Sequence, residues 1–208
     1  MKDMSKISKA VIKRLPRYRR YLADLQKHGV ERVSSGRLSE IMGYTASQIR
    51  QDLNNFGGFG QQGYGYNVAA LGEEIDNILG LGKSYEIVIV GIGNLGHAVA
   101  NYLYYYLDEF KIHALFDVKD NVIGTELHGI KVEHTDNLEA YLENNKIDIG
   151  VITTNKESAQ EIADALVKGN VRAIWNFAPT DLEVPSDTAL QYEHLSDSLH
   201  ELVYYMNN

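Results

Sequence analysis

Cysteine is absent from this chain of 208 residues. Its absence excludes disulfides, thiolate metal sites and a cysteine nucleophile, and it is typical of a cytoplasmic protein. The sequence also lacks any apolar run that approaches about eighteen residues, so we expect no transmembrane helix. The basic start of the chain contains no uncharged apolar core and does not match a secretory signal. We therefore expect a cytoplasmic protein.

Length and composition predict two small globular domains. Apolar side chains make up 44% of the chain and charged side chains 23%, both ordinary values for a folded protein. The charge is unevenly divided: residues 1–60 hold 12 Lys and Arg against 5 Asp and Glu, whereas residues 81–208 hold 8 against 20. A basic first part suggests contact with a polyanion. The alternative is an ordinary solvated surface of mixed charge. The charge balance does not distinguish the two interpretations, whereas the sequence motifs do.

The first part of the chain predicts helices that include a helix-turn-helix. Apolar spacing predicts a helix over residues 5–27, in which Pro16 is expected to start a second helix. A short helix then ends at a tight turn around Gly43. Thr45 opens the next helix, and Gln48 follows at the spacing of a capping box. Helix, glycine turn and helix is the pattern in which the second helix enters the major groove of DNA.

The second helix of this pair is expected to present polar side chains to DNA. The apolar residues predicted to face inward are Ala46, Ile49, Leu53 and Phe56. The residues predicted to face outward are Ser47, Gln48, Arg50, Gln51 and Asn54. Arg pairs with guanine, and Gln or Asn with adenine, through the edges exposed in the major groove. Further DNA contacts are expected from Thr45, Arg14 and Arg17.

A glycine-rich segment follows and predicts a β-hairpin wing. Residues 57–66 hold five glycines in ten positions together with Phe59, Tyr64 and Tyr66. A closing helix is expected over residues 67–79. We thus interpret residues 1–80 as a winged helix-turn-helix domain that binds double-stranded DNA. A plain three-helix bundle without DNA binding is the alternative.

A dinucleotide-binding fingerprint follows the break at residues 80–84. A predicted buried strand, residues 85–90, leads directly into Gly91-Ile92-Gly93-Asn94-Leu95-Gly96 and a helix. A second strand, residues 112–116, ends at Asp117. Strand, glycines, helix, strand and terminal acid in this order are a specific signature of a Rossmann domain. We expect further strand–helix units to extend a parallel sheet over residues 84–193.

Each fingerprint residue has its own expected role. Gly91 permits a tight turn, Gly93 lets the backbone approach a pyrophosphate, and Gly96 lets the helix pack closely against the strand. Asp117 can accept the ribose hydroxyls of an adenosine and would repel the 2′-phosphate of NADP, so NAD(H) is the expected cofactor. The nearby basic residue Lys119 slightly weakens the expected preference for NAD(H) over NADP(H). Asp117 also disfavours CoA as the ligand. The cofactor-binding residues expected from the loop are Gly91, Ile92, Gly93, Asn94, Leu95 and Gly96.

The end of the chain predicts an amphipathic helix. Its apolar stripe consists of Leu195, Leu199, Leu202, Val203 and Met206. The stripe can pack on its own domain or on a partner chain, and both remain open from the pattern alone. The seven histidines form no cluster with metal-ligand spacing, so we expect no metal site.

Taken in order, these segments resemble the Rex family of redox-sensing transcriptional repressors. The segments that carry the resemblance are AVIKRLPRYRRYL, RVSS, TASQIRQDL, NNFGGFGQQGYGY, VGIGNLGHAVANY, LFDV, GTELHGIKV and WNFAP. The resemblance runs nearly end to end. It implies an α/β fold: an N-terminal winged helix-turn-helix domain, a Rossmann-type parallel-sheet domain and a C-terminal dimerisation helix, residues 194–208, swapped in a homodimer. It also implies binding to palindromic operator DNA when NADH is low and release by NADH.

The resemblance further implies residues for the switch between the two states. The ligand-responsive tyrosine of the family corresponds to Tyr102, and the basic residue that senses it corresponds to Arg20. The chain departs from the family where His194 stands at the position of an acid and where Gln51 replaces a basic residue. A third departure is Asn155, which stands where proline is frequent. We hypothesise that Tyr102 changes partners between Arg20 and His194.

A small NAD-dependent oxidoreductase is the rival interpretation, because a fingerprint does not fix chemistry. A dehydrogenase needs a substrate pocket and a proton donor beside the nicotinamide. The Rossmann sheet uses most of the residues after Gly82, and no histidine pairs with an obvious acid. A binding module that uses NADH and NAD⁺ as signals, without catalysis, fits the sequence better.

Overall fold

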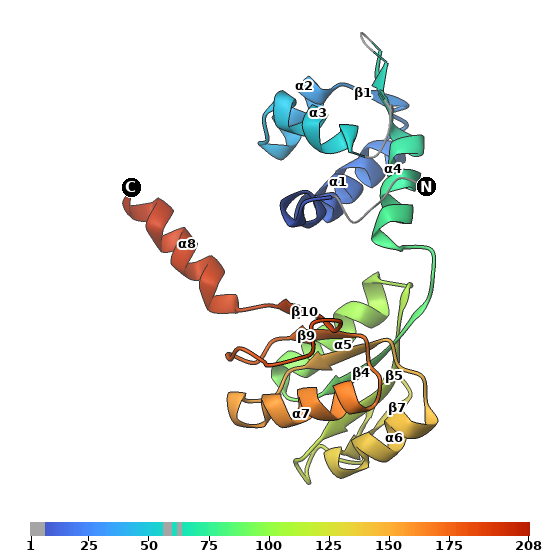
Figure 1. The fold of residues 1–208 in the computed structure, drawn as a ribbon, viewed down its shortest axis with the longest axis vertical. Coiled ribbons are helices and arrows are strands. Elements are labelled where there is room, and N and C mark those ends of the chain that lie inside the picture. Colours follow the sequence, from blue (N-terminus) through green and yellow to red (C-terminus); the bar gives the residue numbers. More distant parts are fainter. Residues whose placement is uncertain (1–6, 56–59, 62–63) are drawn as a thin grey trace. The chain divides into compact units, whose positions relative to one another are not determined.

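A computed structural model describes the chain except for residues 1–6, 56–59 and 62–63. The chain forms two compact units, residues 1–83 and 84–208 (Figure 1). Phe56 and Phe59, which the sequence places at the helix end and in the wing, lie outside the described residues. In the part that the structure covers, no helix combines the length and apolar character needed to cross a membrane.

The first unit combines helices with a small antiparallel sheet. Its elements are α1 (Lys9–Lys27), β1 (Arg32–Val33), α2 (Ser35–Met42), α3 (Ala46–Asn54), β2 (Gly60–Gln61), β3 (Gly65–Asn67) and α4 (Val68–Leu79). The strands lie in the order β1-β3-β2, with β2 and β3 forming the expected hairpin. Helix, turn, helix and hairpin therefore follow one another as in a winged helix-turn-helix.

The expected helix start at Pro16 is wrong. α1 continues through Pro16 without a break, from its N-cap Ser8 to Lys27. Proline removes one backbone hydrogen bond from a helix interior. Here the buried stripe of α1 runs past it on both sides and packs against α4, which offsets that loss. The stripe consists of Val11, Leu15, Tyr18 and Leu22.

Side-chain caps and a left-handed glycine fix the helix-turn-helix. The hydroxyls of Ser34 and Thr45 each accept a backbone N–H from the first turn of α2 and α3. Gly43 ends α2 in the left-handed region, with φ of 71°, where a side chain would be strained. Between the helices, Leu38 and Ile49 are fully buried in the core of this unit. The helix-turn-helix is thus stabilised by the caps of its two helices, by the glycine turn and by the apolar contacts between the helices.

The second unit is a seven-stranded sheet with helices on both faces (Figure 1). Its strands are β4 (Tyr85–Val90), β5 (Phe110–Asp117), β6 (Glu126–Leu127), β7 (Ile130–His134), β8 (Ile149–Ile152), β9 (Ala173–Asn176) and β10 (Ala189–Tyr192). Its helices are α5 (Asn94–Tyr106), α6 (Leu138–Asn144), α7 (Lys156–Lys168) and α8 (Leu195–Asn207), with a short 3₁₀ turn at Thr135–Asn137. The strand order is β10-β9-β8-β4-β5-β7-β6, and only β6 pairs antiparallel.

Alternate residues of β4 serve the two cores of this unit. Val88 and Val90 pack with α6 and α7, whereas Ile87 and Ile89 pack with α5. A strand covered on both faces needs apolar residues at every position, which is why residues 87–90 read as an unbroken apolar run. This confirms the expected Rossmann-type sheet and places the carboxyl ends of β4, β5 and β8 together.

The C-terminal helix α8 has an exposed apolar stripe. All of α8 is described, and none of its residues is buried. Its apolar stripe is more than half exposed at Leu195, Leu199, Leu202, Val203 and Met206. The structure therefore gives no support to packing on its own domain, one of the two alternatives from the sequence, and packing on a partner chain stays a prediction. Its exposed area is the kind that an association site presents.

Candidate functional site

The turn after β4 requires glycine at two positions. Gly91 has φ of 100°, and an added Cβ would lie 2.8 Å from the carbonyl carbon of Thr153 at the end of β8. An added Cβ on Gly96, in the first turn of α5, would overlap the carbonyl oxygen of Gly91. Both glycines therefore let backbone segments meet where a side chain would separate them. Their expected roles in the turn and in close packing agree with this geometry.

Gly93 has a different environment. Its backbone is extended, with φ of −78°, and an added Cβ would meet nothing within 4 Å. It is the N-cap of α5 and lines an open pocket. Glycine is thus not required here by the protein's own packing. The open space leaves room for a ligand beside the backbone, and the free N–H groups of a helix N-terminus favour an anion.

The carboxylate of Asp117 ties the strand end to the glycine loop. Asp117 is buried, and one oxygen accepts the backbone N–H of Ile92 at 2.6 Å while the other accepts that of Lys119 at 2.8 Å. A carboxylate has about four lone-pair sites, so two further hydrogen bonds remain open. Asp117 also lines the pocket. It can therefore hold the loop and accept two ribose hydroxyls at the same time.

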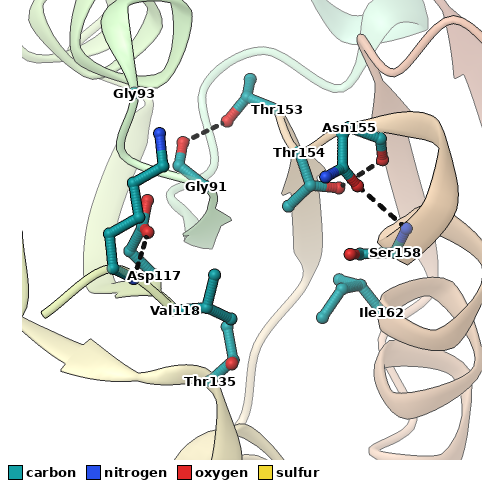
Figure 2. Close-up of a pocket in the computed structure, with 11 residues that line it drawn as sticks. Gly91, Gly93, Asp117, Val118, Thr135, Thr153, Thr154, Asn155, Ser158 and Ile162 are labelled. Carbon is teal, nitrogen blue, oxygen red and sulfur yellow. Dashed lines mark hydrogen bonds between the residues drawn. The ribbon is translucent and has the colours of Figure 1, made fainter.

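The pocket lies at the carboxyl ends of three strands, between the glycine loop and the start of α7 (Figure 2). In an open α/β sheet this edge is where ligands bind. Its lining residues are Gly91, Gly93, Asp117, Val118, Lys119, Thr135, Thr153, Thr154, Asn155, Ser158 and Ile162. Of the residues expected at the cofactor site, the structure brings Gly91, Gly93 and Asp117 into this lining.

Sequence reasoning missed the far wall of the pocket. The hydroxyl of Thr153 donates to the carbonyl oxygen of Gly91 at 2.6 Å, and Asn155 caps α7 by accepting the backbone N–H of Ser158. Figure 2 shows Asn155 and Ser158 on the opposite side of the pocket from Asp117. The sequence signal that could have located this wall is the end of the predicted strand before α7, because the carboxyl ends of parallel strands lie at one edge of a sheet. Asn155, noted only as a departure from the family, is thus both a helix cap and a pocket residue.

The other expected residues of this unit lie around the pocket. Ile92, Asn94 and Leu95 form the loop and the first turn of α5. Tyr102 is two turns further along α5, is 51% exposed and packs its ring against Tyr106. Tyr102 is not one of the residues that line this pocket. His194 precedes α8, and its ring stacks on Tyr192 with centroids 5.5 Å apart.

The outer face of α3 agrees only in part with expectation. Ser47, Arg50, Gln51 and Asn54 are exposed, and Thr45 caps the helix. Arg50 reaches α2, where its Nη1 donates to the hydroxyl of Ser35 at 3.0 Å. Gln48 differs from the prediction, because it is half-buried and its amide turns toward Asp52. The capping box is therefore one-sided: Thr45 accepts the Gln48 N–H, while the Gln48 side chain is bound elsewhere.

Asp52 is the centre of a buried network between α1 and α3. Its carboxylate accepts Nε and Nη2 of Arg14, each at 2.7 Å, the hydroxyl of Tyr18 at 3.0 Å and Nε2 of Gln48 at 2.8 Å. Burial raises the pKa of Asp52, but the hydrogen bonds from Arg14, Gln48 and Tyr18 outweigh it and leave the pKa below its ordinary value. Burial and the nearby carboxylate raise the pKa of Tyr18. The group therefore stays an ion pair at neutral pH.

This network changes the interpretation of Arg14. The sequence suggested a DNA contact, whereas the structure pairs its guanidinium in two-point geometry with a carboxylate that is 1% exposed. Arg17 lies over the ring of Tyr44 at 5.0 Å and donates to its hydroxyl at 3.3 Å. Arg20 is exposed and lies over the ring of Tyr21. Arg14 thus has a structural role in α1, while its predicted contact with DNA stays a prediction. Arg17 and Arg20 lie on the surface of α1.

Within the described ranges, the structure has no group of three His, Asp or Glu side chains placed to hold a metal ion.

Comparison with known proteins gives matches over the whole chain. Residues 6–54 match the family described as the putative DNA-binding protein N-terminus, and residues 82–180 match the CoA binding domain family. The redox-sensing transcriptional repressor Rex of Thermoanaerobacter pseudethanolicus is 51% identical over 207 residues, covering 100% of this chain and 92% of that protein. The Rex protein of Clostridium beijerinckii is 52% identical over 207 residues, covering 100% and 98%.

Solved structures agree with these relatives. The structure of RSP in complex with β-NAD⁺ and operator DNA has a TM-score of 0.90 and 51% identity, covering 97% of this chain and 93% of that chain. The complex of RSP with β-NADH has a TM-score of 0.89 and 48% identity, covering 97% and 95%. RSP is described as a Rex-family repressor. With this identity over its full length, the chain belongs to the Rex family of redox-sensing transcriptional repressors.

Proposed function

We propose that this protein is a transcriptional repressor that senses the ratio of NADH to NAD⁺. It binds operator DNA when NADH is low and releases it when NADH binds. The observation that carries the proposal is the pairing, in one chain, of a helix-turn-helix with a nucleotide pocket whose ribose-binding acid is Asp117. A relative that is 51% identical has been crystallised with both β-NAD⁺ and operator DNA, which supports the same two ligands here.

The nucleotide site uses the glycine loop and the strand end. The phosphates are bound at the N-terminus of α5, where Gly93 leaves open space, and the adenosine ribose is bound by Asp117. The carboxylate gives preference to NAD(H) over NADP(H). The match of residues 82–180 to a CoA binding family reflects the shared Rossmann architecture in this proposal, because CoA carries a 3′-phosphate on the ribose that a buried acid repels.

The DNA site uses the exposed face of α3. Ser47, Arg50, Gln51 and Asn54 reach base edges or phosphates in the major groove, with Gln48 beside them. Arg17 at the surface of α1 adds a phosphate contact. Because α8 leaves an apolar stripe uncovered, the working form is a homodimer joined in part by α8. Two-fold symmetry then demands a palindromic operator.

The switch uses Tyr102, whose hydroxyl changes partners with the charge on the nicotinamide. Arg20 receives it in one state and His194, at the start of α8, in the other. An allosteric signal requires two states that each ligand contacts differently. Oxidised and reduced nicotinamide differ by one hydride and one positive charge, so the sensing group belongs near that ring. The protein acts in the cytoplasm, where its DNA and its cofactor occur together.

Catalysis is not part of the proposed function. The rival activity, hydride transfer to a small substrate, needs a proton donor beside the nicotinamide. The polar residues on the far wall of the pocket are Thr153, Thr154, Asn155 and Ser158. Hydroxyls and an amide of this kind bind and orient a nucleotide, and Thr153 and Asn155 are already engaged with the backbone. In this proposal the protein binds NADH and NAD⁺ as signals and transfers no hydride.

One titration tests this function. The full-length protein with NAD⁺ first selects duplexes from a randomised DNA library, and binding to the selected duplex is then measured at several ratios of NADH to NAD⁺. We expect release of DNA as NADH rises, with both nucleotides recovered unchanged by chromatography. Binding that is independent of the ratio would contradict redox sensing. Consumption of NADH with a candidate carbonyl substrate would favour the oxidoreductase instead.

A further inference from the structure

We propose that Asp52 is a positioning residue for base recognition: it fixes the amide of Gln48 so that Gln48 reads adenine in the operator. Asp52 is buried, so it would act through a neighbouring side chain and not by contacting DNA. Its carboxylate accepts a hydrogen bond from Gln48, which is half-buried on the side of α3 that is expected to face DNA. This inference rests on the proposed function, because it assigns a specificity to the same DNA-reading helix.

The carboxylate of Asp52 has no lone pair to spare. Oδ1 accepts Nη2 of Arg14 and Nε2 of Gln48, and Oδ2 accepts Nε of Arg14 and the hydroxyl of Tyr18. Four donors meet about four lone-pair sites. Loss of any donor leaves part of a buried anion unpaired, which is costly. Gln48 is therefore held in place by the same balance that holds the ion pair.

This arrangement decides which way the amide of Gln48 points. An ionised carboxylate only accepts hydrogen bonds, so the group facing Asp52 must be the NH₂ of Gln48 and not its oxygen. The low pKa of Asp52 keeps the carboxylate ionised. One N–H is used by Asp52 at 2.8 Å. The amide oxygen and the second N–H remain for a partner outside the domain.

An acceptor beside a donor is the pattern complementary to adenine. In the major groove adenine offers the N6 amino group as donor and N7 as acceptor, whereas guanine offers two acceptors, O6 and N7. Guanine in the same position would set one of its two acceptors against the outward amide oxygen of Gln48. Avoiding this would require the NH₂ group of Gln48 to face outward and its oxygen to face the carboxylate of Asp52. That orientation places two acceptors against each other. The buried ion pair thus transmits a base preference that Gln48 alone, which can rotate, would not have.

The test compares base preferences of variants with the randomised duplex library and NAD⁺. The wild type is expected to select adenine at one position of each half-site, and Gln48→Ala to lose that preference while the other positions stay. Asp52→Asn replaces a carboxylate that only accepts by an amide that can present either its oxygen or its NH₂ to Gln48. The amide of Gln48 is then no longer held in one orientation, and the preference for adenine over guanine weakens. We expect a change of about tenfold in the adenine-to-guanine ratio at that position.

Tyr18→Phe is the matched control. It also removes one hydrogen bond from Asp52 but leaves the bond to Gln48, so the base preference should not move. Equal changes in Tyr18→Phe and Asp52→Asn would mean a general loosening of the domain and would overturn the proposal. So would Gln48→Ala selecting the same bases as wild type. If instead the wild type selects no sequence at all, the proposed function fails, and the two failures are distinguishable.

A second measurement applies to the wild type and does not depend on the folding of Asp52→Asn. The side-chain amide of Gln48, assigned by NMR with Gln48→Ala, should show slowed rotation and a shifted Nε2 proton. Gln51, exposed on the same helix, is the internal reference. A Gln48 amide that rotates as freely as that of Gln51 would overturn the assignment of Asp52 as its positioning residue.

Discussion

Gly96 packs so closely against Gly91 that a Cβ on Gly96 would overlap the carbonyl oxygen of Gly91. Gly93, which lies between them in the same loop, has open space around its own missing Cβ. Glycines of one motif therefore serve two different purposes. Two of them are needed by the fold, and the proposed function assigns the third to ligand binding.

The first prediction separates these purposes. Gly93→Val should lower the melting temperature by no more than about 2–4 degrees, because its extended backbone accepts a branched residue and only the preference of the N-cap for glycine is lost. It should abolish NADH binding by filling the phosphate site. Gly96→Ala should instead destabilise the protein by about 1–3 kcal/mol, because the backbone must shift. Calorimetric melting and NADH titration of both variants check this. A Gly93→Val variant that binds NADH normally would move the phosphate site elsewhere.

The second prediction concerns cofactor choice. Asp117→Ala removes the acceptor for the ribose and the anchor for the Ile92 N–H. We expect the affinity for NADH to fall about tenfold, or 1.4 kcal/mol, and the preference over NADPH to narrow. Asp120→Ala, which removes an exposed acid three residues later, is the control and should change neither. Equal affinity of the wild type for NADPH and NADH in calorimetric titration would refute the role of Asp117.

The third prediction concerns the buried ion pair in the first unit. Arg14→Ala leaves the carboxylate of Asp52 unpaired, so the free energy of unfolding should fall by about 3–5 kcal/mol. Arg19→Ala breaks the exposed pair with Asp76, whose side chains are 43% and 37% accessible, and should cost only about 0–1 kcal/mol. Urea unfolding of the two variants at neutral pH makes the comparison. Similar losses in both would contradict a special role for Asp52.

The same pair sets a pH dependence. Because the pKa of Asp52 lies below its ordinary value of 3.8 in the folded protein, its stabilising effect is present above that value. The effect is lost as the pH falls through the lowered pKa. The difference between wild type and Arg14→Ala should therefore be largest near neutral pH and shrink in acid. A difference that grows as the pH falls would have the wrong sign for this mechanism.

Local sequence signals predicted the glycine loop and Asp117, because strand, turn and acid lie close together in the chain. They could not predict that Thr153 meets Gly91, since that contact depends on the order of strands in the sheet. The ion pair of Arg14 and Asp52 was missed for a related reason: its partners are 38 residues apart and both look like surface charges. Long-range polar contacts have no periodicity that a sequence displays.

Element boundaries show the same contrast. The unbroken apolar stripe of α1 was visible, but the local rule for proline outweighed it at Pro16, and tertiary packing reversed that choice. The edge strands β6 and β10 were not predicted at all. Each is short and only partly buried, so its composition carries little of the apolar signal that marked β4.

The fourth prediction concerns association through α8. Leu202 is 63% exposed in the chain, and burying a leucine contributes about 1.5–3 kcal/mol. Leu202→Glu should therefore raise the dissociation constant of the dimer about tenfold or more, seen by light scattering over a dilution series. His200→Glu adds the same acid on the same helix outside the apolar stripe and should leave the dimer intact. A Leu202→Glu variant as dimeric as wild type would exclude α8 from the interface.

The last prediction concerns the coupling of NADH to DNA release. Tyr102→Phe keeps the ring that packs on Tyr106, at 5.5 Å between centroids, and removes only the hydroxyl. NADH affinity should stay within about tenfold of wild type, or 1.4 kcal/mol, because ring packing is retained. The NADH concentration that releases DNA should rise by more than the affinity changes, since the hydroxyl carries the difference between the two states. Tyr106→Phe, on the neighbouring turn of α5, is the matched control and should release DNA as wild type does. If Tyr102→Phe also releases DNA at the wild-type NADH concentration, the hydroxyl of Tyr102 is not the sensing group.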